Sequence, residues 1–260
     1  MSAINGINLK RVAEEQPNDQ PDPKRLETLL GAVEKIESAV QPGFRAKALY
    51  RFPDGGTYKG PTLHEKMHGK GILKLADGSK YKGFFENGLK KGRGTFTLPN
   101  NAKYVGDFAN DMMEGEGVFT FPCGTKYTGQ LKADLFEGIG TLESLKAKYN
   151  GQFSKQKMHG QGVLTFKREE TEDGKKSTED GGEIFIGEFL EDKMKKGTFK
   201  FWVGQKTYIY VGDFLDGEMK GPGILYSGDG DKGSIENGIL TGMKQQVELP
   251  RFVNGRIVPS

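Results

Sequence analysis

A unit of about 23 residues recurs along most of this chain, and this repetition constrains the fold more than any other feature of the sequence. A period of roughly 20 to 50 residues is typical of architectures in which each unit stacks on its neighbours. We therefore expect one elongated array and not a globule with a deep core. The copies begin at Tyr58, Tyr81, Tyr104, Tyr127, Tyr149, Phe185, Tyr210 and Asp231.

Within a copy, the residue types alternate as they do on the two faces of a strand. A glycine stands two residues after the leading ring and a second ring is usual two residues later, as in Tyr81, Gly83 and Phe85. A second segment carries Gly-x-Gly and then large apolar residues at the same alternate spacing, as from Gly92 to Leu98. Because side chains alternate along a strand, the rings and glycines share one face. The pattern predicts two strands in each copy.

Turn signals separate the two segments. Asn87-Gly88, Asp216-Gly217 and Asn237-Gly238 are dipeptides that favour a tight hairpin turn. A second turn, such as Ala76-Asp77-Gly78, joins one copy to the next. Glycine normally weakens a strand, yet 39 of the 260 residues are glycine, about twice the usual share. We interpret the strand glycines as hollows that are filled by rings of the neighbouring hairpin.

The stretch Tyr81–Gly94, YKGFFENGLKKGRG, resembles the MORN repeat (membrane occupation and recognition nexus), and Tyr149–Gly162 is similarly close. The resemblance covers about Tyr58–Gly242. It implies an all-β fold, an elongated twisted antiparallel sheet of stacked β-hairpins. The sequence also predicts a short N-terminal helix before the sheet.

Three copies depart from the family pattern, and one of them is the copy at Tyr58, which has Thr62 where an aromatic residue is usual. In the copy at Phe185 the later glycine is displaced to Gly197 and the second glycine is missing, and the copy at Asp231 has lost its leading aromatic residue. Worn copies of this kind are expected near the ends of an array.

The resemblance also implies a function. Arrays of this family occur in radial-spoke and other axonemal proteins, in parasite cytoskeletal proteins, in junction-tethering proteins, and beside catalytic domains in lipid kinases and a lysine methyltransferase. They are credited with protein–protein contacts and with phospholipid binding. We expect a non-catalytic scaffold, located in the cytoplasm, whose partners are other proteins of a cytoskeletal complex such as the axoneme of a cilium or flagellum. The alternatives are a membrane-surface tether that binds anionic phospholipid, and a regulatory subunit of a separate enzyme. The oligomeric state stays open.

Segments on both sides of the array (residues 44–243) lack the repeat. Residues 1–22 are polar and are typical of a flexible or extended arm. Residues 23–41 are predicted to form an amphipathic helix, because apolar side chains recur at helical spacing between Leu26 and Val40. The helix either caps the open edge of the first hairpin or docks on a partner.

Two further segments are rich in polar or turn-forming residues. The insertion 167–183 carries charges of both signs, and it is interpreted as a solvated loop or as a partner contact tuned by phosphorylation at Thr171, Ser177 or Thr178. The tail 244–260 carries a hairpin signal at Asn254-Gly255. That hairpin either closes the far end of the sheet or adds a strand to a neighbouring sheet.

The sequence gives no case for catalysis. The net charge of +3 comes without a basic block, so nucleic acid is not expected as a partner. The single cysteine, Cys123, excludes a disulfide framework, and neither a secretory signal nor a membrane-spanning apolar run is visible. His68 and His159 occupy the same slot of two copies, which favours a structural role over metal binding. We expect no enzyme activity, no cofactor and no metal.

The rings of the repeat form the candidate partner-binding groove. Either they pack on the glycines of the next hairpin and hold the array together, or they line a groove that receives a partner peptide or helix. We expect both in part, with ring bodies packed and with ring edges and hydroxyls exposed for binding. The candidate residues are Tyr58, Tyr81, Phe85, Tyr104, Phe108, Tyr127, Tyr149, Phe153, Phe185, Phe189, Tyr210 and Phe214.

Overall fold

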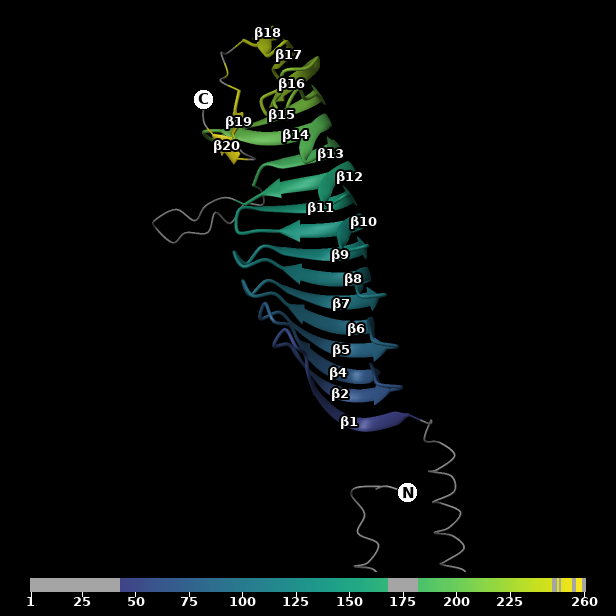
Figure 1. Cartoon of the computed structure of the whole chain (residues 1–260). Helices are drawn as coiled ribbons and strands as arrows, with labels where there is room; N and C mark the ends of the chain where they lie inside the picture. Colours follow the sequence, from purple (N-terminus) through teal and green to yellow (C-terminus); the bar gives the residue numbers. More distant parts are fainter. Residues whose placement is uncertain (1–42, 168–181, 245–246, 248, 254–255, 259–260) are drawn as a thin grey trace, which may run out of the picture.

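A computed structural model describes residues 43–167, 182–244, 247, 249–253 and 256–258. Eighteen strands of this part form one sheet, in which strands consecutive in the chain pair antiparallel, except that β4 pairs with β2 and not with the short β3. No helix occurs among the described residues. The sheet is an elongated stack with β1 at one end and β18 at the other (Figure 1). The predicted all-β array of stacked hairpins is confirmed.

The strands of the main sheet have the following bounds. They are β1 (Phe44–Arg51), β2 (Thr57–Leu63), β3 (Lys66–Met67), β4 (Gly69–Lys74), β5 (Lys80–Glu86), β6 (Leu89–Thr97), β7 (Lys103–Ala109), β8 (Met112–Thr120), β9 (Lys126–Lys132), β10 (Leu135–Glu143), β11 (Ala147–Ser154), β12 (Lys157–Phe166), β13 (Ile184–Leu190), β14 (Lys193–Val203), β15 (Lys206–Asp213), β16 (Gly223–Ser227), β17 (Lys232–Glu236) and β18 (Ile239–Thr241). A separate two-stranded sheet consists of β19 (Arg251–Val253) and β20 (Arg256–Val258).

The tight turn inside each repeat has one backbone conformation. Both central residues have positive φ, for example 52° at Asn87 and 92° at Gly88. This is the signature of the type I′ turn, whose twist matches that of the flanking strands. The same geometry occurs at Lys155-Gln156, with φ of 49° and 70°, where the sequence carries no turn signal.

The two glycines of each Gly-x-Gly segment have different roles. Gly92 has a φ of 62° and lies where the register of β5 against β6 shifts. This is a β-bulge, and the left-handed conformation favours glycine there. Gly94 instead lies under the ring of Tyr81, and a Cβ at Gly94 would overlap that ring. The first glycine therefore permits a bend and the second leaves space for a side chain.

The repeat that begins at Phe185 retains the second of these glycines. Gly197 pairs with Gly187 across β13 and β14, as Gly94 pairs with its partner glycine on β5. Lys195 stands at the register shift, in the place of the bulge glycine. The expectation that Gly197 is a displaced glycine in a copy without the second glycine is therefore wrong.

Several predicted segments lie outside the described residues. They are the arm 1–22, the helix expected over 23–41 and most of the insertion 167–183. In the tail, Phe252 of β19 pairs with Ile257 of β20, at the place where the sequence predicted a small hairpin. Val247 and Leu249 precede this hairpin and pack against the core of the main sheet.

Candidate partner-binding groove

Each leading tyrosine lies on the glycine pair of its own hairpin. The ring of Tyr104 covers Gly106 on β7 and Gly117 on β8, and a Cβ at either glycine would overlap the ring. The expectation that these hollows receive rings of the neighbouring hairpin is wrong. The hydroxyl groups are also used within the repeat, since each donates to the backbone carbonyl three residues later. These bonds join Tyr58 to Pro61, Tyr81 to Phe84, Tyr104 to Asp107, Tyr127 to Gln130, Tyr149 to Gln152 and Tyr210 to Asp213.

The phenylalanine four residues after the leading ring couples neighbouring repeats. The ring of Phe85 meets Tyr81 of its own repeat and Tyr58 of the preceding repeat edge to face, with centroids 5.0 and 5.3 Å apart. Edge-to-face contacts are a favourable arrangement of aromatic rings. We expected neighbouring repeats to be joined by rings that pack on glycines. They are joined instead by contacts of phenylalanine rings with the leading rings of two repeats. Phe108, Phe153, Phe189 and Phe214 make the same contacts.

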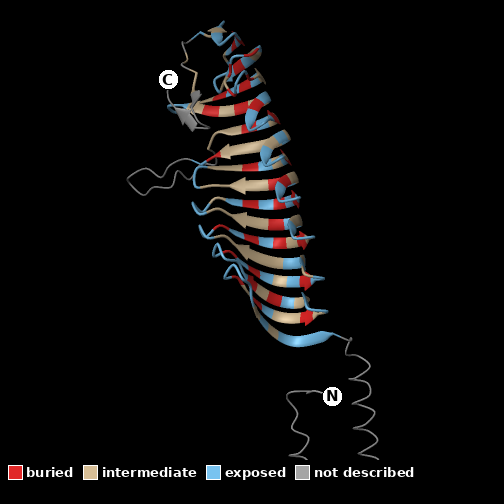
Figure 2. Cartoon of the chain, in the orientation of Figure 1, coloured by how far each residue is buried: buried red, intermediate tan, exposed pale blue. Residues whose placement is uncertain are grey.

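All twelve rings expected to line the groove are buried, with 0 to 4% of their surface exposed. The structure therefore brings them together, but as the core of the array, and buried residues recur on successive strands along it (Figure 2). The expectation that ring edges and hydroxyls are exposed is corrected. Each leading ring fits onto its glycine pair, each of the other phenylalanines packs between two leading rings, and each tyrosine hydroxyl meets the backbone. The corrected residues are Tyr58, Tyr81, Phe85, Tyr104, Phe108, Tyr127, Tyr149, Phe153, Phe185, Phe189, Tyr210 and Phe214.

This burial changes the acidity of the phenols. Loss of water around the ring raises the pKa of Tyr104 to about 12, and the nearby carboxylate of Asp107 acts in the same direction. Burial likewise raises the pKa of Tyr81 and Tyr149 to about 12. Neutral, hydrogen-bonded tyrosines are therefore part of the core.

Over β6 to β12, a second row of side chains on the same face is only partly buried, and sequence reasoning did not select it. The residue that pairs with a leading ring across the strands is large and apolar, as Phe119 is opposite Tyr104 and Leu142 is opposite Tyr127. Its signal was present in the sequence as the apolar residues after each Gly-x-Gly. The partly buried residues that pack on the core include Phe96, Met113, Phe119, Phe121, Leu142, Met158 and Leu164.

This face is hollowed over β10 to β14. A cavity of about 400 Å³ has Leu142 and Leu164 in its lining. Ser144 and Asp216, which lie in turns at opposite ends of the strands, also line it. Since both strand ends contribute, the sheet curves around the face that carries the rings. We call this surface the ring-side groove: the hollow together with the partly buried row just described.

The charged groups at the rim of the ring-side groove are engaged within the chain. Lys193 Nζ lies 2.9 Å from Asp216 Oδ1, and this bond holds the pKa of the Asp216 carboxyl below its ordinary value. The carboxylate of Asp192 accepts the N–H of Met158 at 2.8 Å. The groove therefore offers a partner mainly apolar surface.

The two histidines weighed for metal binding, His68 and His159, have backbone contacts within their repeats. The backbone carbonyl of His159 lies 3.4 Å from the hydroxyl of Tyr149, and that of His68 lies 3.5 Å from the hydroxyl of Tyr58, so the shared slot is part of the repeat. The carboxylate of Glu114 accepts the N–H of Ala133. The part of the chain that the structure describes holds no group of three or more His, Cys, Asp or Glu side chains suited to a metal ion. It also holds no helix with the length and apolar character needed to span a membrane.

Comparison with protein families agrees with this geometry. The family model of the MORN repeat matches residues 66–80, 81–103, 104–126, 127–144, 149–168 and 210–232. The copy that begins at Phe185 and all but the first two residues of the copy that begins at Asp231 fall outside these segments, although β13, β14 and β17 continue the same sheet. A search of curated proteins gave no match. The six matched repeats, their glycine pairs and the open sheet that they build show that the chain belongs to the MORN-repeat family.

Proposed function

We propose that this chain is a non-catalytic scaffold that binds a partner protein in the ring-side groove. MORN repeats are modules for interaction with proteins or with membrane lipids. The observation that carries the proposal is the row of partly buried apolar side chains that runs over β6 to β12 on top of a fully buried core. Apolar stripes of this kind mark interaction surfaces, and aromatic and methionine side chains are enriched in them.

The spacing of the repeats favours a helical occupant. Two strands per repeat, at about 4.8 Å each, give a rise of roughly 10 Å per repeat. Residues seven apart on an α-helix are separated by about 10.5 Å along its axis. An amphipathic helix that lies along the groove thus presents one apolar side chain to each repeat.

The cellular setting that we propose is a cytoskeletal assembly in the cytoplasm, with the axoneme of a cilium or flagellum as its specific case. Its support is the resemblance of the repeats to those of axonemal and parasite cytoskeletal proteins. Proximity labelling on the full chain, followed by fractionation, tests this setting. Labelled tubulin or spoke components in the detergent-insoluble fraction are the expected result, and labelling confined to membrane proteins would overturn it.

The groove itself is tested by paired substitutions on opposite faces of the sheet. Leu142→Gln with Leu164→Gln changes the groove, while Ile186→Gln with Val211→Gln changes exposed apolar residues of the other face. We expect the first variant to lose the partner found by labelling and the second to retain it. Circular dichroism and thermal melting establish that both variants are folded. A folded groove variant with unchanged partner affinity would refute the proposal.

A milder change covers the case in which the glutamine variant does not fold. Met158→Ala removes a flexible side chain at the edge of the same hollow. It should weaken the partner by about tenfold, since truncation of a contributing interface residue costs on the order of 1–2 kcal/mol. Unchanged affinity in this folded variant also counts against the groove.

A further inference from the structure

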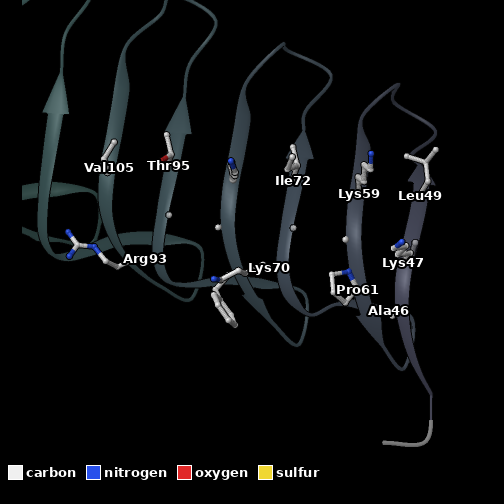
Figure 3. Close-up of a pocket in the computed structure, with 17 residues that line it drawn as sticks. Ala46, Lys47, Leu49, Lys59, Pro61, Lys70, Ile72, Arg93, Thr95 and Val105 are labelled. Carbon is white, nitrogen blue, oxygen red and sulfur yellow. The ribbon is translucent and has the colours of Figure 1, made fainter. Parts of the chain in front are cut away.

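The opposite face of the sheet carries a second groove, of about 980 Å³, over β1 to β7. Its side chains stand in two rows that run across the strands (Figure 3). One row contains Leu49, Lys59, Ile72, Thr95 and Val105, and the other contains Lys47, Pro61, Lys70 and Arg93 (Figure 3). Because this face points away from the buried rings, the second groove is independent of the ring-side groove and of the function proposed for it.

Cationic and uncharged side chains alternate in both rows from β1 to β6. The strands β2, β4, β5 and β6 each supply one of each, two residues apart, on either side of a backbone glycine, as Lys59 and Pro61 do on β2. On β1, Lys47 and Leu49 stand on either side of Ala48. Antiparallel pairing reverses the order on the next strand, so Ile72 lies between Lys59 and Lys82 in the first row. The cations of the two rows are Lys47, Lys59, Lys70, Lys82 and Arg93. We call this surface the cationic groove.

The lysines of the cationic groove lack compensating acids. Among the residues that the structure describes, no acidic side chain lines the groove. Lys47, Lys59, Lys70 and Lys82 form no ion pair with any other described residue, and Arg93 Nε lies 4.0 Å from a carboxylate oxygen of Asp107 at the far end. Elsewhere on the sheet, lysines meet acids at closer range, as Lys157 meets Glu191 at 3.1 Å.

The fold itself does not require these cations. The same positions beside the paired glycines hold Asp107 on β7 and Glu116 on β8, and further along they hold Gln130 and Gln152. The positive stretch is therefore confined to the first repeats. Between its cations, apolar side chains remain accessible, with 65% of Leu49 and 46% of Phe84 exposed. An accessible surface that is both cationic and apolar suits a ligand that is both acidic and apolar.

We propose that the cationic groove binds an acidic amphipathic helix of a partner protein. Six strands at about 4.8 Å span roughly 24 Å, the length of about 16 helical residues. Cations in one row recur on every second strand, at about 9.6 Å, close to the 10.5 Å between helical residues seven apart. A hollow between two rows receives a rod better than it receives a flat bilayer, so the shape favours a helix over a membrane surface.

The test uses the full chain and a fluorescein-labelled synthetic helix of about 18 residues, with leucine on one face and glutamate at the flanking positions. A second peptide carries lysine in place of every glutamate. The groove variant combines Lys59→Glu with Lys82→Glu. The control combines Lys126→Glu with Lys132→Glu, which gives the same change of charge on β9, outside the groove. All four lysines are exposed, so the core is untouched.

We expect the glutamate peptide to bind and the lysine peptide not to bind. Binding should weaken about tenfold or more in the groove variant and with added salt, because charge complementarity sets the encounter. The control should bind as the unchanged chain does. Equal binding by the groove variant and the control would overturn the proposal, and Lys59→Gln with Lys82→Gln repeats the test without charge reversal.

Two further results would assign the groove to another occupant and also overturn the proposal. One is binding of phosphatidylserine vesicles that is lost in the groove variant while the glutamate peptide does not bind. The other is self-association of the full chain that the groove variant abolishes, as seen by sedimentation, which would identify a second copy as the occupant. A negative result in these experiments on the cationic groove does not count against the function proposed for the ring-side groove, because that function is tested with different residues on the other face.

Discussion

The hydroxyl of Tyr104 donates a hydrogen bond of 3.0 Å to the backbone carbonyl of Asp107, three residues further along the same strand. Three residues of extended strand span about 10 Å, which is beyond the reach of a tyrosine side chain along a flat strand. The strand therefore bends around the ring. The repeated bond connects a local sequence pattern to the curvature that shapes the ring-side groove.

Removal of this hydroxyl should destabilise the array moderately. In Tyr104→Phe the ring still fills its glycine pair, but the hydrogen bond to Asp107 is lost. We expect the free energy of unfolding to fall by about 0.5–1.5 kcal/mol, the net value of one hydrogen bond. Urea unfolding followed by circular dichroism measures it. Tyr226→Phe, at a ring that is 42% exposed, is the matched control, and an equal effect of both changes would show that the buried hydroxyl contributes nothing.

The space under the ring gives a second prediction. A Cβ at Gly106 would overlap the Tyr104 hydroxyl, and Phe108 blocks the ring from moving aside. Gly106→Val should therefore lower the free energy of unfolding by roughly 1–3 kcal/mol, the usual cost of overpacking. Thr128→Val, on the exposed face of β9, controls for valine in a strand and should be nearly neutral. If Gly106→Val is as stable as this control, the ring does not occupy the glycine pair.

The sequence was sufficient to predict the hairpins but not to predict which glycines their aromatic rings cover. Tyr81, Gly83 and Phe85 share a face in any strand, so the alternation alone specifies paired strands. Whether Tyr81 covers its own glycines or those of a neighbour depends on how far the strand bends. A β-bulge at Gly92 on the partner strand adds to the bend, and the alternation of residues does not reveal it.

The bend of the strands also explains why the rings predicted to line a groove are buried in the core. The most regular positions, such as Tyr104 and Phe108, are regular because the core requires them, and the curved sheet buries them. The accessible row, which includes Phe119 and Leu142, varies in residue type along the array and gave a weaker pattern. In a repeat protein of this kind, the strongest periodicity therefore marks the core, and binding residues stand beside it.

The buried tyrosines predict a loss of stability at alkaline pH. Burial raises the pKa of Tyr104 and Tyr210 to about 12, whereas tyrosine in an unfolded chain ionises near about 10. The folded state retains protons that the unfolded state releases, so this stability is fully present below about pH 10 and is lost as pH rises through the folded pKa.

Urea unfolding across this range measures the effect, with tyrosinate absorbance followed in parallel. We expect the free energy of unfolding to decline as pH rises above about 10, and tyrosinate to appear together with loss of the sheet signal. Tyr104→Phe should make the decline shallower, because one raised pKa is removed. Tyrosinate formation near pH 10 with an intact sheet would contradict the burial of these phenols.

The turn at Lys155-Gln156 offers a stabilising change. Both residues have the positive φ of a type I′ turn, which is unfavourable for side chains such as these and is the preferred geometry of Asn-Gly. Two hydrogen bonds hold this turn: the backbone N–H of Lys155 donates to the carboxylate of Glu137, and the backbone N–H of Gln156 donates to the carbonyl of Phe136. Because both donors are backbone groups, the substitution preserves both hydrogen bonds. We expect Lys155→Asn with Gln156→Gly to raise the free energy of unfolding by about 0.5–1 kcal/mol in urea. The reciprocal change at Asn87-Gly88, to Lys-Gln, should lower it by a similar amount; if neither change alters stability, packing between repeats and not turn chemistry sets this conformation.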